Sequence, residues 1–419
     1  MRVCVLGAGI AGLASAYRLQ REGHEVTVID RAGAAAGASG ANGAQLSYAY
    51  VQPLADPSIW RQLPNLLTAR DSPLTLKPQW DPDQWRWGLR FLAACRAGAS
   101  QRTTAQLLQL AAESRHGFDR FRAEHALDCD FSATGKLVLY PDERAFAMAR
   151  RQLALQQRLG TQQSAVDAAA CVEIEPALHH YRDRIAGAVH TPGECAADCQ
   201  KVCLELLRIV RQGGARFIAG REVTGLAVRR RIVHAVRLDQ GEIEADAFVV
   251  ALGTGSRQLA RGLGVYLPVY PLKGYSITLP AAQSPAVPKV NVTVASRKVV
   301  FARIGNRLRV AGMAELVGDD LSVPAGRIAS LVATARDVFP DCAGSPLDGG
   351  WAGLRPATPT GIPIIGALPS APANLLFNTG HGALGFTLAF GSAARIAGLL
   401  RSTTTRFRPV AAEPASCSA

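Results

Sequence analysis

Residues 2–30 read RVCVLGAGIAGLASAYRLQREGHEVTVID, and this stretch decides the fold of the first part of the chain. The short apolar run at 2–6 predicts a buried parallel strand that ends at a glycine. Apolar positions spaced along 10–22 predict a helix with one buried side, and 25–30 predicts a second strand. The three segments make one βαβ unit, the building block of a doubly wound α/β sheet.

Three glycines stand at the turn between the first strand and the helix. Gly7, Gly9 and Gly12 form a Gly-x-Gly-x-x-Gly motif, and Asp30 ends the second strand 18 residues after Gly12. The first glycine permits a tight turn, the second lets the backbone approach a pyrophosphate, and the third allows close packing of helix on strand. The helix N-terminus favours phosphate, and the aspartate can accept hydrogen bonds from a ribose. We therefore expect an adenine dinucleotide, contacted by Gly7, Ala8, Gly9, Ile10, Ala11, Gly12, Asp30 and Arg31.

Two further segments of small residues favour FAD over NAD as that dinucleotide. Loop 39–45 (SGANGAQ) follows the second strand, where flavoproteins of this type thread the ribityl chain and the pyrophosphate. Segment 251–255 (ALGTG) follows an apolar strand at 247–252, a placement that suits backbone approach to the adenine half. A tight turn in an ordinary loop is the alternative interpretation of each segment. The additional cofactor contacts that we expect are Ser39, Asn42, Gly43, Ala44, Gln45, Leu46, Val223, Gly253 and Thr254.

A second glycine-rich turn opens the last predicted helix, which runs from about 382 to 400. Segment 378–387 (NTGHGALGFT) leads directly into this helix, and such a turn makes an anion site. In a flavoprotein the anion is the N1–C2=O edge of the reduced flavin, which a fixed helix dipole stabilises. His381 either hydrogen-bonds to the flavin or only packs beside its ring. The contacts expected from this turn are Gly382, Ala383, Leu384, Gly385, Phe386 and Thr387.

One arginine stands where a merely solvated charge is unusual. Arg355 lies between apolar residues and a proline in segment 351–356 (WAGLRP). This segment precedes the glycine-rich turn at 378–387, which is called the closing turn below. A guanidinium can grip a substrate carboxylate through two parallel hydrogen bonds. A structural salt bridge is the alternative role for this side chain.

The chain has 419 residues, of which 48% are hydrophobic and 19% are charged, and this composition excludes a disordered protein. A chain of this length is long enough to form two sizeable hydrophobic cores. Strands at 269–279 and 298–313 predict an antiparallel sheet. The fold class is therefore α/β, a Rossmann-type FAD-binding domain with an interleaved α+β substrate domain. We expect 1–56, 193–262 and 349–402 in the FAD-binding domain, 57–192 and 263–348 in the substrate domain, and 403–419 as a flexible tail.

The net charge of +13 raises the question of anionic partners. Only six of the 46 basic residues are lysine, so a compositional bias toward arginine explains most of the charge. The alternative is attraction to an anionic membrane surface, and RNA binding would require the arginines to cluster on one face. No uncharged apolar run long enough for a membrane span and no signal peptide are evident. We expect a cytoplasmic protein, with or without peripheral contact to the inner membrane, that binds no nucleic acid and no metal.

Four segments together resemble the D-amino-acid dehydrogenase small-subunit family, within the glycine oxidase and D-amino-acid oxidase superfamily. They are 270–280 (YPLKGYSITLP), 309–318 (RVAGMAELVG), 353–361 (GLRPATPTG) and 378–387, and the resemblance extends over about 1–402. Thr360 departs from the pattern, in which aspartate is more usual. Loop 47–56 (SYAYVQPLAD) also differs from the commonest version, which leaves the substrate preference open.

The resemblance implies oxidative deamination of a D-amino acid. Flavin N5 would accept a hydride from the substrate Cα, the imino acid would hydrolyse to a 2-oxo acid and ammonia, and the electrons would pass to a quinone or another respiratory acceptor. Arg355 would hold the carboxylate, with Arg303 as a second contact. Tyr275, Tyr48 and Tyr50 would line or gate the pocket. The alternative is an oxidase or dehydrogenase of a related amine, such as D-hydroxyproline, glycine or another secondary amino acid.

Overall fold

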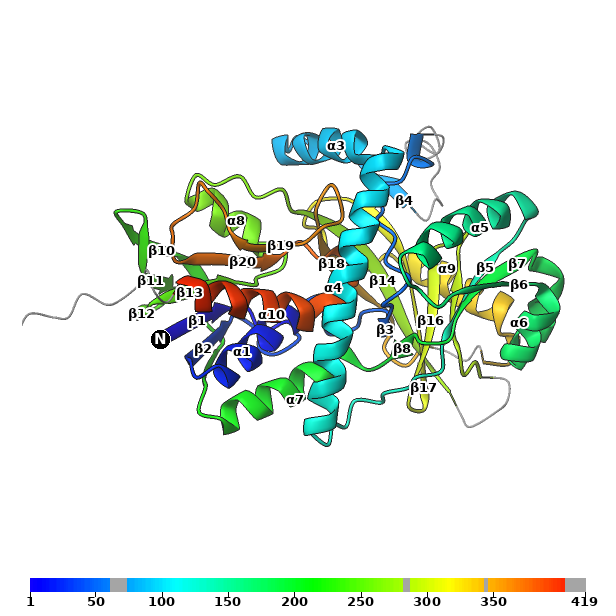
Figure 1. Ribbon diagram of the computed structural model, residues 1–419, viewed down its shortest axis with the longest axis horizontal. Coiled ribbons are helices and arrows are strands. Elements are labelled where there is room, and N and C mark those ends of the chain that lie inside the picture. Colours follow the sequence, from blue (N-terminus) through cyan, green and yellow to red (C-terminus); the bar gives the residue numbers. More distant parts are fainter. Residues whose placement is uncertain (61–73, 282–286, 343–345, 404–419) are drawn as a thin grey trace, which may run out of the picture.

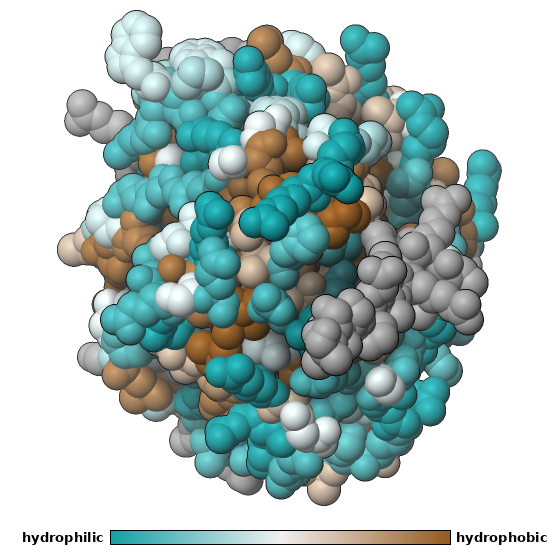
Figure 2. Space-filling view, turned by 90° about the vertical axis from the view of Figure 1, so that its left-hand side faces the viewer, coloured by the Kyte–Doolittle hydropathy of each residue, from teal (hydrophilic) through white to brown (hydrophobic). Residues whose placement is uncertain are grey.

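Two large β-sheets lie side by side along the long axis of the protein (Figure 1). The computed structural model describes residues 1–60, 74–281, 287–342 and 346–403. Each sheet is assembled from segments that are far apart in the sequence, so the chain passes between the sheets several times. The end of the molecule next to the first sheet carries mostly hydrophilic side chains, interrupted by separate apolar areas (Figure 2).

The first sheet has six strands, and its neighbouring strands are parallel except for the antiparallel pair β19–β20. The predicted strands of the opening βαβ unit, β1 and β2, lie next to each other near its middle. The sheet is therefore the doubly wound sheet that the sequence predicts. Its order is β19 (Ile364–Ala367), β20 (Leu375–Thr379), β13 (Ala247–Val250), β1 (Arg2–Leu6), β2 (Glu25–Asp30) and β9 (Arg216–Ala219).

Both faces of this sheet are covered, which explains why its strands are continuously apolar. Val3 and Val5 point into one hydrophobic core, whereas Cys4 and Leu6, the alternate residues of β1, point into another. The first core contains α1 (Ile10–Arg21), α7 (Cys199–Gln212) and α10 (Gly385–Thr403). The second contains α8 (Gly255–Gly262) and a small sheet of β10 (Val223–Arg229), β11 (Ile232–Leu238) and β12 (Glu242–Glu244).

Helix α10 is the core helix that the apolar segment near the C-terminus predicts. Within the described part of the chain, the helical stretch 382–402 is the one that is long and apolar enough to cross a membrane. It packs instead between α1 and α4 (Ala97–Glu124), with Leu388, Ile396 and Leu400 buried. Burial against these two helices accounts for its composition.

The second sheet has nine strands and is mostly antiparallel. Its parallel pairs are β5–β15 and β4–β17. Its order is β18 (Trp351–Ala357), β14 (Tyr270–Pro280), β17 (Arg307–Leu316), β16 (Val299–Ile304), β15 (Asn291–Val294), β5 (Lys136–Tyr140), β7 (Gly187–Thr191) and β6 (Ser164–Val166), with β4 (Leu74–Leu76) beside β17.

Short helices cover one face of this sheet and leave the other toward the first sheet. Leu331 and Tyr181 join the buried residues of β14, β16 and β17 in a third core. The elements on this face are α6 (Ala168–Ile174), the 3-10 helix η1 (Pro176–Arg184), α9 (Ala325–Val338) and the 3-10 helix η2 (Pro340–Cys342). Helix α5 (Glu143–Arg158) lies on the opposite face, where Ala149 and Leu153 pack on Val189 of β7. A separate two-stranded pair consists of β3 (Gln45–Leu46) and β8 (Cys195–Ala196), and the 3-10 helix η3 (Gly382–Leu384) precedes α10.

Two segments lie in a different part of the fold from the one that the sequence predicts. Strand β18 was expected in the FAD-binding domain, but it pairs with β14 and therefore extends the antiparallel sheet to Ala357. Helix α4 was expected in the substrate domain, but Leu107, Leu110 and Phe118 pack in the core that contains α1 and α10. The predicted tail at 403–419 lies outside the described residues except for Thr403, the last residue of α10.

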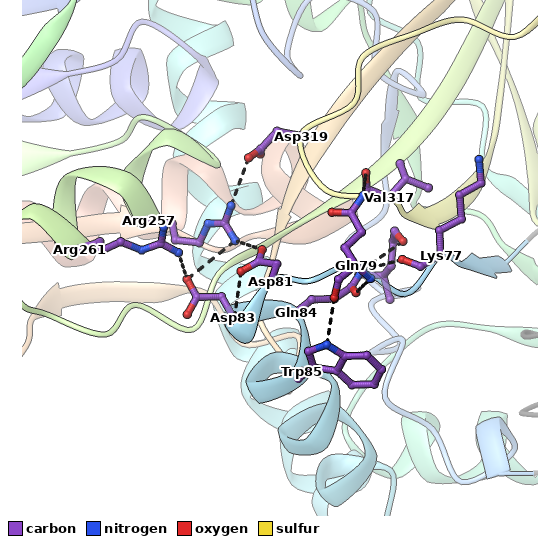
Figure 3. Close-up of polar contacts among 11 residues, drawn as sticks. Lys77, Gln79, Asp81, Asp83, Gln84, Trp85, Arg257, Arg261, Val317 and Asp319 are labelled. Atoms are coloured by element: carbon purple, nitrogen blue, oxygen red, sulfur yellow. Dashed lines mark hydrogen bonds and ion pairs between the residues drawn. The ribbon is translucent and has the colours of Figure 1, made fainter.

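A cluster of charges fixes helix α3 (Pro82–Ala94) to both parts of the molecule (Figure 3). Arg257 of α8 is nearly buried and lies 3.2 Å from carboxylate oxygens of both Asp81 and Asp319. Asp81 also caps α3 by accepting a hydrogen bond from the Asp83 amide. At the inner side of the helix, the Trp87 indole donates to the Ala357 carbonyl at 2.8 Å. These contacts hold α3 in one orientation.

Candidate active site

A large cavity lies between the two sheets and is lined by residues from both. Its volume is about 2080 Å³. Small-molecule pockets are usually roughly 300–1,000 Å³, so this cavity can hold a dinucleotide together with a second ligand. Part of its lining comes from four segments of small residues: the turn at 7–12, called the fingerprint turn here, and segments 39–45, 251–255 and 382–387. Strands β14, β17 and β18 line another part.

The three glycines of the fingerprint turn differ in the space that surrounds the position of a Cβ atom. A Cβ on Gly7 would lie 2.4 Å from the Ala251 carbonyl oxygen, and the backbone there has φ of +107°. A Cβ on Gly12 would lie 2.0 Å from the Gly7 carbonyl oxygen. At Gly9 the nearest atom is the Ser39 hydroxyl oxygen at 3.3 Å, and the residue lines the cavity. Gly7 and Gly12 thus serve close packing, while Gly9 leaves space for a ligand.

The Asp30 carboxylate lies at the cavity edge and is already engaged with backbone amides. It accepts hydrogen bonds from Ala8 at 2.8 Å, Ala32 at 2.9 Å and Gly33 at 3.0 Å. A carboxylate offers about four acceptor positions, so one remains for a ribose hydroxyl. The neighbouring Arg31 also lines the cavity and lies 3.6 Å from Glu222 in an exposed ion pair.

Most of the predicted cofactor contacts line this cavity. Ala8, Gly12 and Leu46 do not: Gly12 packs against Gly7, and Ala8 and Leu46 are buried in the first core. The residues that do line it are Gly7, Gly9, Ile10, Ala11, Asp30, Arg31, Ser39, Asn42, Gly43, Ala44, Gln45, Val223, Gly253, Thr254, Gly382, Ala383, Leu384, Gly385, Phe386 and Thr387.

His381 is buried at the start of the closing turn and lines the cavity. Its Nε2 lies 3.1 Å from the Ser392 hydroxyl oxygen, and that hydroxyl donates to carbonyls of its own helix. Because the hydroxyl proton is directed at these carbonyls, the hydrogen bond to Ser392 forms when Nε2 carries the ring proton. Burial lowers the pKa of the imidazole to about 4, so the ring is neutral at pH 7. His381 can offer no positive charge to a ligand in the cavity.

Loop 47–50 is held against the cavity by a buried carboxylate. Glu194 accepts hydrogen bonds from the amides of Tyr48 at 2.6 Å, Ala49 at 2.8 Å and Tyr50 at 3.1 Å. The Ser47 amide donates to the Thr387 hydroxyl at 3.1 Å, which ties the loop to α10. The loop therefore has a fixed conformation next to the closing turn.

Lys136 is a cavity residue that the sequence reasoning missed. It is buried at the start of β5, where its Nζ donates to the Ser47 hydroxyl at 3.0 Å and lies 4.3 Å from the centre of the Tyr50 ring. Burial lowers the pKa of its ammonium group to about 8. A lysine at the head of the apolar strand 136–140 is the signal that could have revealed it.

Arg355 lines the cavity and keeps most of its hydrogen-bonding capacity. Its Nη1 donates to the Met313 carbonyl at 2.8 Å, and the guanidinium lies over Gly274. Among the residues that the structure describes, no carboxylate lies within 4.0 Å of it, which argues against the structural salt bridge. Burial lowers its pKa to about 10, so the side chain is charged at pH 7.

The other predicted substrate contacts differ in their placement. Tyr50 and Tyr275 line the cavity, but the Tyr275 hydroxyl donates to Glu315 at 2.6 Å and is not free for a substrate. Tyr48 does not line it, because its ring is buried in the first core beneath Arg115. Arg303 is also absent from the lining, since its Nε donates to the Gly305 carbonyl in the turn after β16.

The arrangement fits FAD. The fingerprint turn, the free side of Gly9 and the carboxylate of Asp30 suit an adenine dinucleotide, and the cavity continues from them to the closing turn at His381. The N-terminal end of α10 lines this continuation, and a helix N-terminus suits a flavin ring that needs hydrogen-bond donors. Arg355 then lies in the same cavity as the ring.

Comparison with known proteins shows the family of the chain. Residues 2–399 match the family described as FAD dependent oxidoreductase. The chain is 47% identical over 413 residues to D-amino acid dehydrogenase 2 of Ralstonia nicotianae, covering 96% of each chain. It is 44% identical to D-amino acid dehydrogenase 2 of Pseudomonas aeruginosa, covering 94% of each.

Solved structures confirm the fold at low sequence identity. Glycine oxidase from Geobacillus kaustophilus superposes with a TM-score of 0.76 at 21% identity, covering 98% of this chain and 97% of that one. The matching family, the full-length relatives and the dinucleotide site lead to one conclusion. The chain belongs to the FAD-dependent oxidoreductase family, and FAD is its cofactor.

Proposed function

We propose that this protein is a D-amino acid dehydrogenase. It oxidises a D-amino acid at the Cα–N bond, and water then converts the imino acid to a 2-oxo acid and ammonia. The observation that carries the proposal is the guanidinium of Arg355, which lies without a carboxylate partner among the described residues in the cavity of the dinucleotide fingerprint. The relatives that are 44–47% identical over nearly the whole chain support the choice of substrate.

The residues of this chain would bind and orient the substrate. When bound, FAD supplies the two-electron oxidant. Arg355 would hold the two carboxylate oxygens, which fixes the Cα relative to the rest of the cavity. Tyr50 and the apolar part of the Tyr275 ring would form walls. No side chain is needed as a general base if the amine enters neutral, so its proton is lost to solvent before binding.

The test is a panel of substrates with the purified holoenzyme and a dye as electron acceptor. We expect turnover of D-amino acids, release of ammonia and no turnover of the L-enantiomers. Glycine and D-hydroxyproline belong in the panel because loop 47–56 differs from the commonest version of the family. Faster turnover of either than of every D-amino acid would replace the proposal with the related-amine alternative.

We further propose a quinone or another respiratory carrier as the electron acceptor. The dehydrogenase names of the relatives support it. The holoenzyme should reduce a short-chain ubiquinone analogue much faster than it reduces oxygen. Hydrogen peroxide formed in amounts equal to the 2-oxo acid, with no gain in rate on adding the quinone, would instead make it an oxidase.

A cytoplasmic location with peripheral contact to the anionic face of the inner membrane is also our proposal. The outer side of α3 supports it, because Trp85 is 54% exposed, Leu89 is 70% exposed and Trp80, just before the helix, is fully exposed. Exposed Arg86 and Arg90 flank them. Tryptophan and arginine on one helix are typical of helices that lie at a lipid headgroup layer.

Vesicle binding tests this contact. We expect the holoenzyme to sediment with phosphatidylglycerol vesicles more than with phosphatidylcholine vesicles. Replacing Trp80 and Trp85 with serine should abolish sedimentation, whereas replacing Trp60, whose indole donates to the Cys95 carbonyl, should not. Equal sedimentation of the serine variant would exclude this surface.

A further inference from the structure

The strand beside Arg355 carries a β-bulge at Met313. Strand β17 pairs with β14 so that Glu315 lies opposite Lys273, and Gly312 lies opposite Tyr275. One residue of β14 is therefore matched by two residues of β17, Met313 and Ala314. Bulges leave the extra residue unpaired and redirect the groups of their strand.

The backbone of Met313 is strained at this bulge. Its φ is +63°, a left-handed conformation that is unusual for a long side chain within a strand. Such a conformation persists only where the surrounding structure enforces it, and it is found preferentially at functional sites. In this protein the strained residue contacts the proposed substrate-binding group, because the Met313 carbonyl accepts a hydrogen bond from Arg355 Nη1 at 2.8 Å.

The residue beneath the guanidinium is a glycine for reasons of space. A Cβ on Gly274 would lie 2.2 Å from Nη2, 2.4 Å from Cζ and 2.7 Å from Nη1 of Arg355. Nothing but the guanidinium comes as close, so any other residue at 274 would displace it. Gly274 and the Met313 carbonyl thus touch the same group from two neighbouring strands, β14 and β17.

We propose that Gly274 and the Met313 bulge are positioning elements that hold the Arg355 guanidinium in one orientation for the substrate carboxylate. Because the Met313 carbonyl takes one N–H of Nη1, the Nε and Nη2 donors stay available for a bidentate carboxylate. The inference rests on the proposed function, since it assumes that Arg355 binds a carboxylate. It adds two residues that act by holding Arg355 in place and so decide how tightly the carboxylate binds.

The experiment measures binding of benzoate to the holoenzyme through the change in flavin absorbance, alongside FAD content and thermal unfolding. Gly274→Ala should weaken benzoate binding by about 10- to 100-fold, the cost of losing hydrogen bonds to a charged group. Its FAD content should stay normal. Met313→Val should also weaken benzoate binding, because a β-branched residue resists the positive φ that aims the carbonyl at Arg355. Unchanged binding in this variant would remove the bulge from the proposal. Gly326→Ala, where a Cβ meets open space, is the control.

A double variant separates positioning from a general structural effect. In an Arg355→Lys background the guanidinium is gone, so adding Gly274→Ala should weaken benzoate binding by less than about twofold. Additive losses would overturn the inference and assign Gly274 a role independent of Arg355. If Arg355→Lys leaves benzoate binding unchanged, the proposed carboxylate site fails. If Arg355→Lys weakens binding but Gly274→Ala does not, only the positioning role fails.

Discussion

The imidazole of His381 and the hydroxyl of Ser392 form a buried pair 3.1 Å apart, eleven residues apart in the chain, at the N-terminal part of α10. The Ser392 hydroxyl also donates to the Leu388 carbonyl at 2.9 Å, which leaves its oxygen as an acceptor for the imidazole with the proton on Nε2. The pair fixes the closing turn against α10. Its stability depends on the imidazole remaining neutral.

Acid should therefore destabilise the protein through His381. Burial lowers its pKa from 6.5 to about 4, so the unfolded chain binds this proton below pH 6.5 while the folded protein resists it. The stabilisation is complete above pH 6.5 and is lost as the pH falls toward 4, by up to about 3 kcal/mol. Urea unfolding at pH 7 and pH 5 should show a smaller loss for His381→Gln than for the unmodified protein. Equal losses in both would contradict this assignment.

Substitutions of two glycines in the fingerprint turn should have different effects. Gly9→Val should yield folded but colourless protein, because a side chain there enters the space of the pyrophosphate and meets little protein. Gly12→Ala should instead yield misfolded protein, since its Cβ would lie 2.0 Å from the Gly7 carbonyl oxygen. Absorbance at flavin wavelengths and circular dichroism of each variant distinguish the two outcomes. If the Gly9→Val protein is yellow, FAD still binds, and the pyrophosphate does not lie at this turn.

Arg355→Lys should keep its fold and FAD but lose about 10²-fold in kcat/KM, which is about 2.7 kcal/mol of transition-state stabilisation. Lysine keeps the charge but not the planar fork that matches a carboxylate. Arg303→Lys is the matched control, because Arg303 lies outside the cavity lining and should show normal kinetics. Near-normal kinetics of Arg355→Lys would leave the carboxylate without its proposed partner.

Glu194→Gln should destabilise the protein and slow catalysis together. Its carboxylate accepts three amide hydrogen bonds from loop 47–50, and an amide group cannot replace them all. We expect the free energy of unfolding to fall by about 3 kcal/mol. Glu175 is a matched control, since it is equally buried and accepts from the amides of Ala177, Lys289 and Val290 away from the cavity.

Glu175→Gln should lose a similar amount of stability but keep normal kinetics in holoenzyme that remains folded. Chemical unfolding and steady-state assays of both variants measure the two effects. Similar kinetic losses in both variants would mean that loop 47–50 has no special role at the cavity.

Local patterns were sufficient to predict much of this protein. The strand, the helix and the glycine spacing between Arg2 and Asp30 lie within one βαβ unit, and each depends on residues only a few positions apart. The closing turn before α10 is predictable for the same reason. The placement of Arg355 between apolar residues and a proline marked it as unusual without any knowledge of its neighbours.

Tertiary structure decided the rest, because it depends on contacts between distant residues. Strand β18 joins the antiparallel sheet through pairs with β14 that are distant in sequence, such as Leu272 with Arg355, 83 positions apart. Tyr48 and Tyr50 look equivalent in the sequence, yet one packs under Arg115 and the other lines the cavity. The sequence alone determined that a dinucleotide binds and that Arg355 is exceptional. Only the packing of the two sheets decided which side chains face the cavity, because burial and charge pairing are properties of residues that the fold brings together.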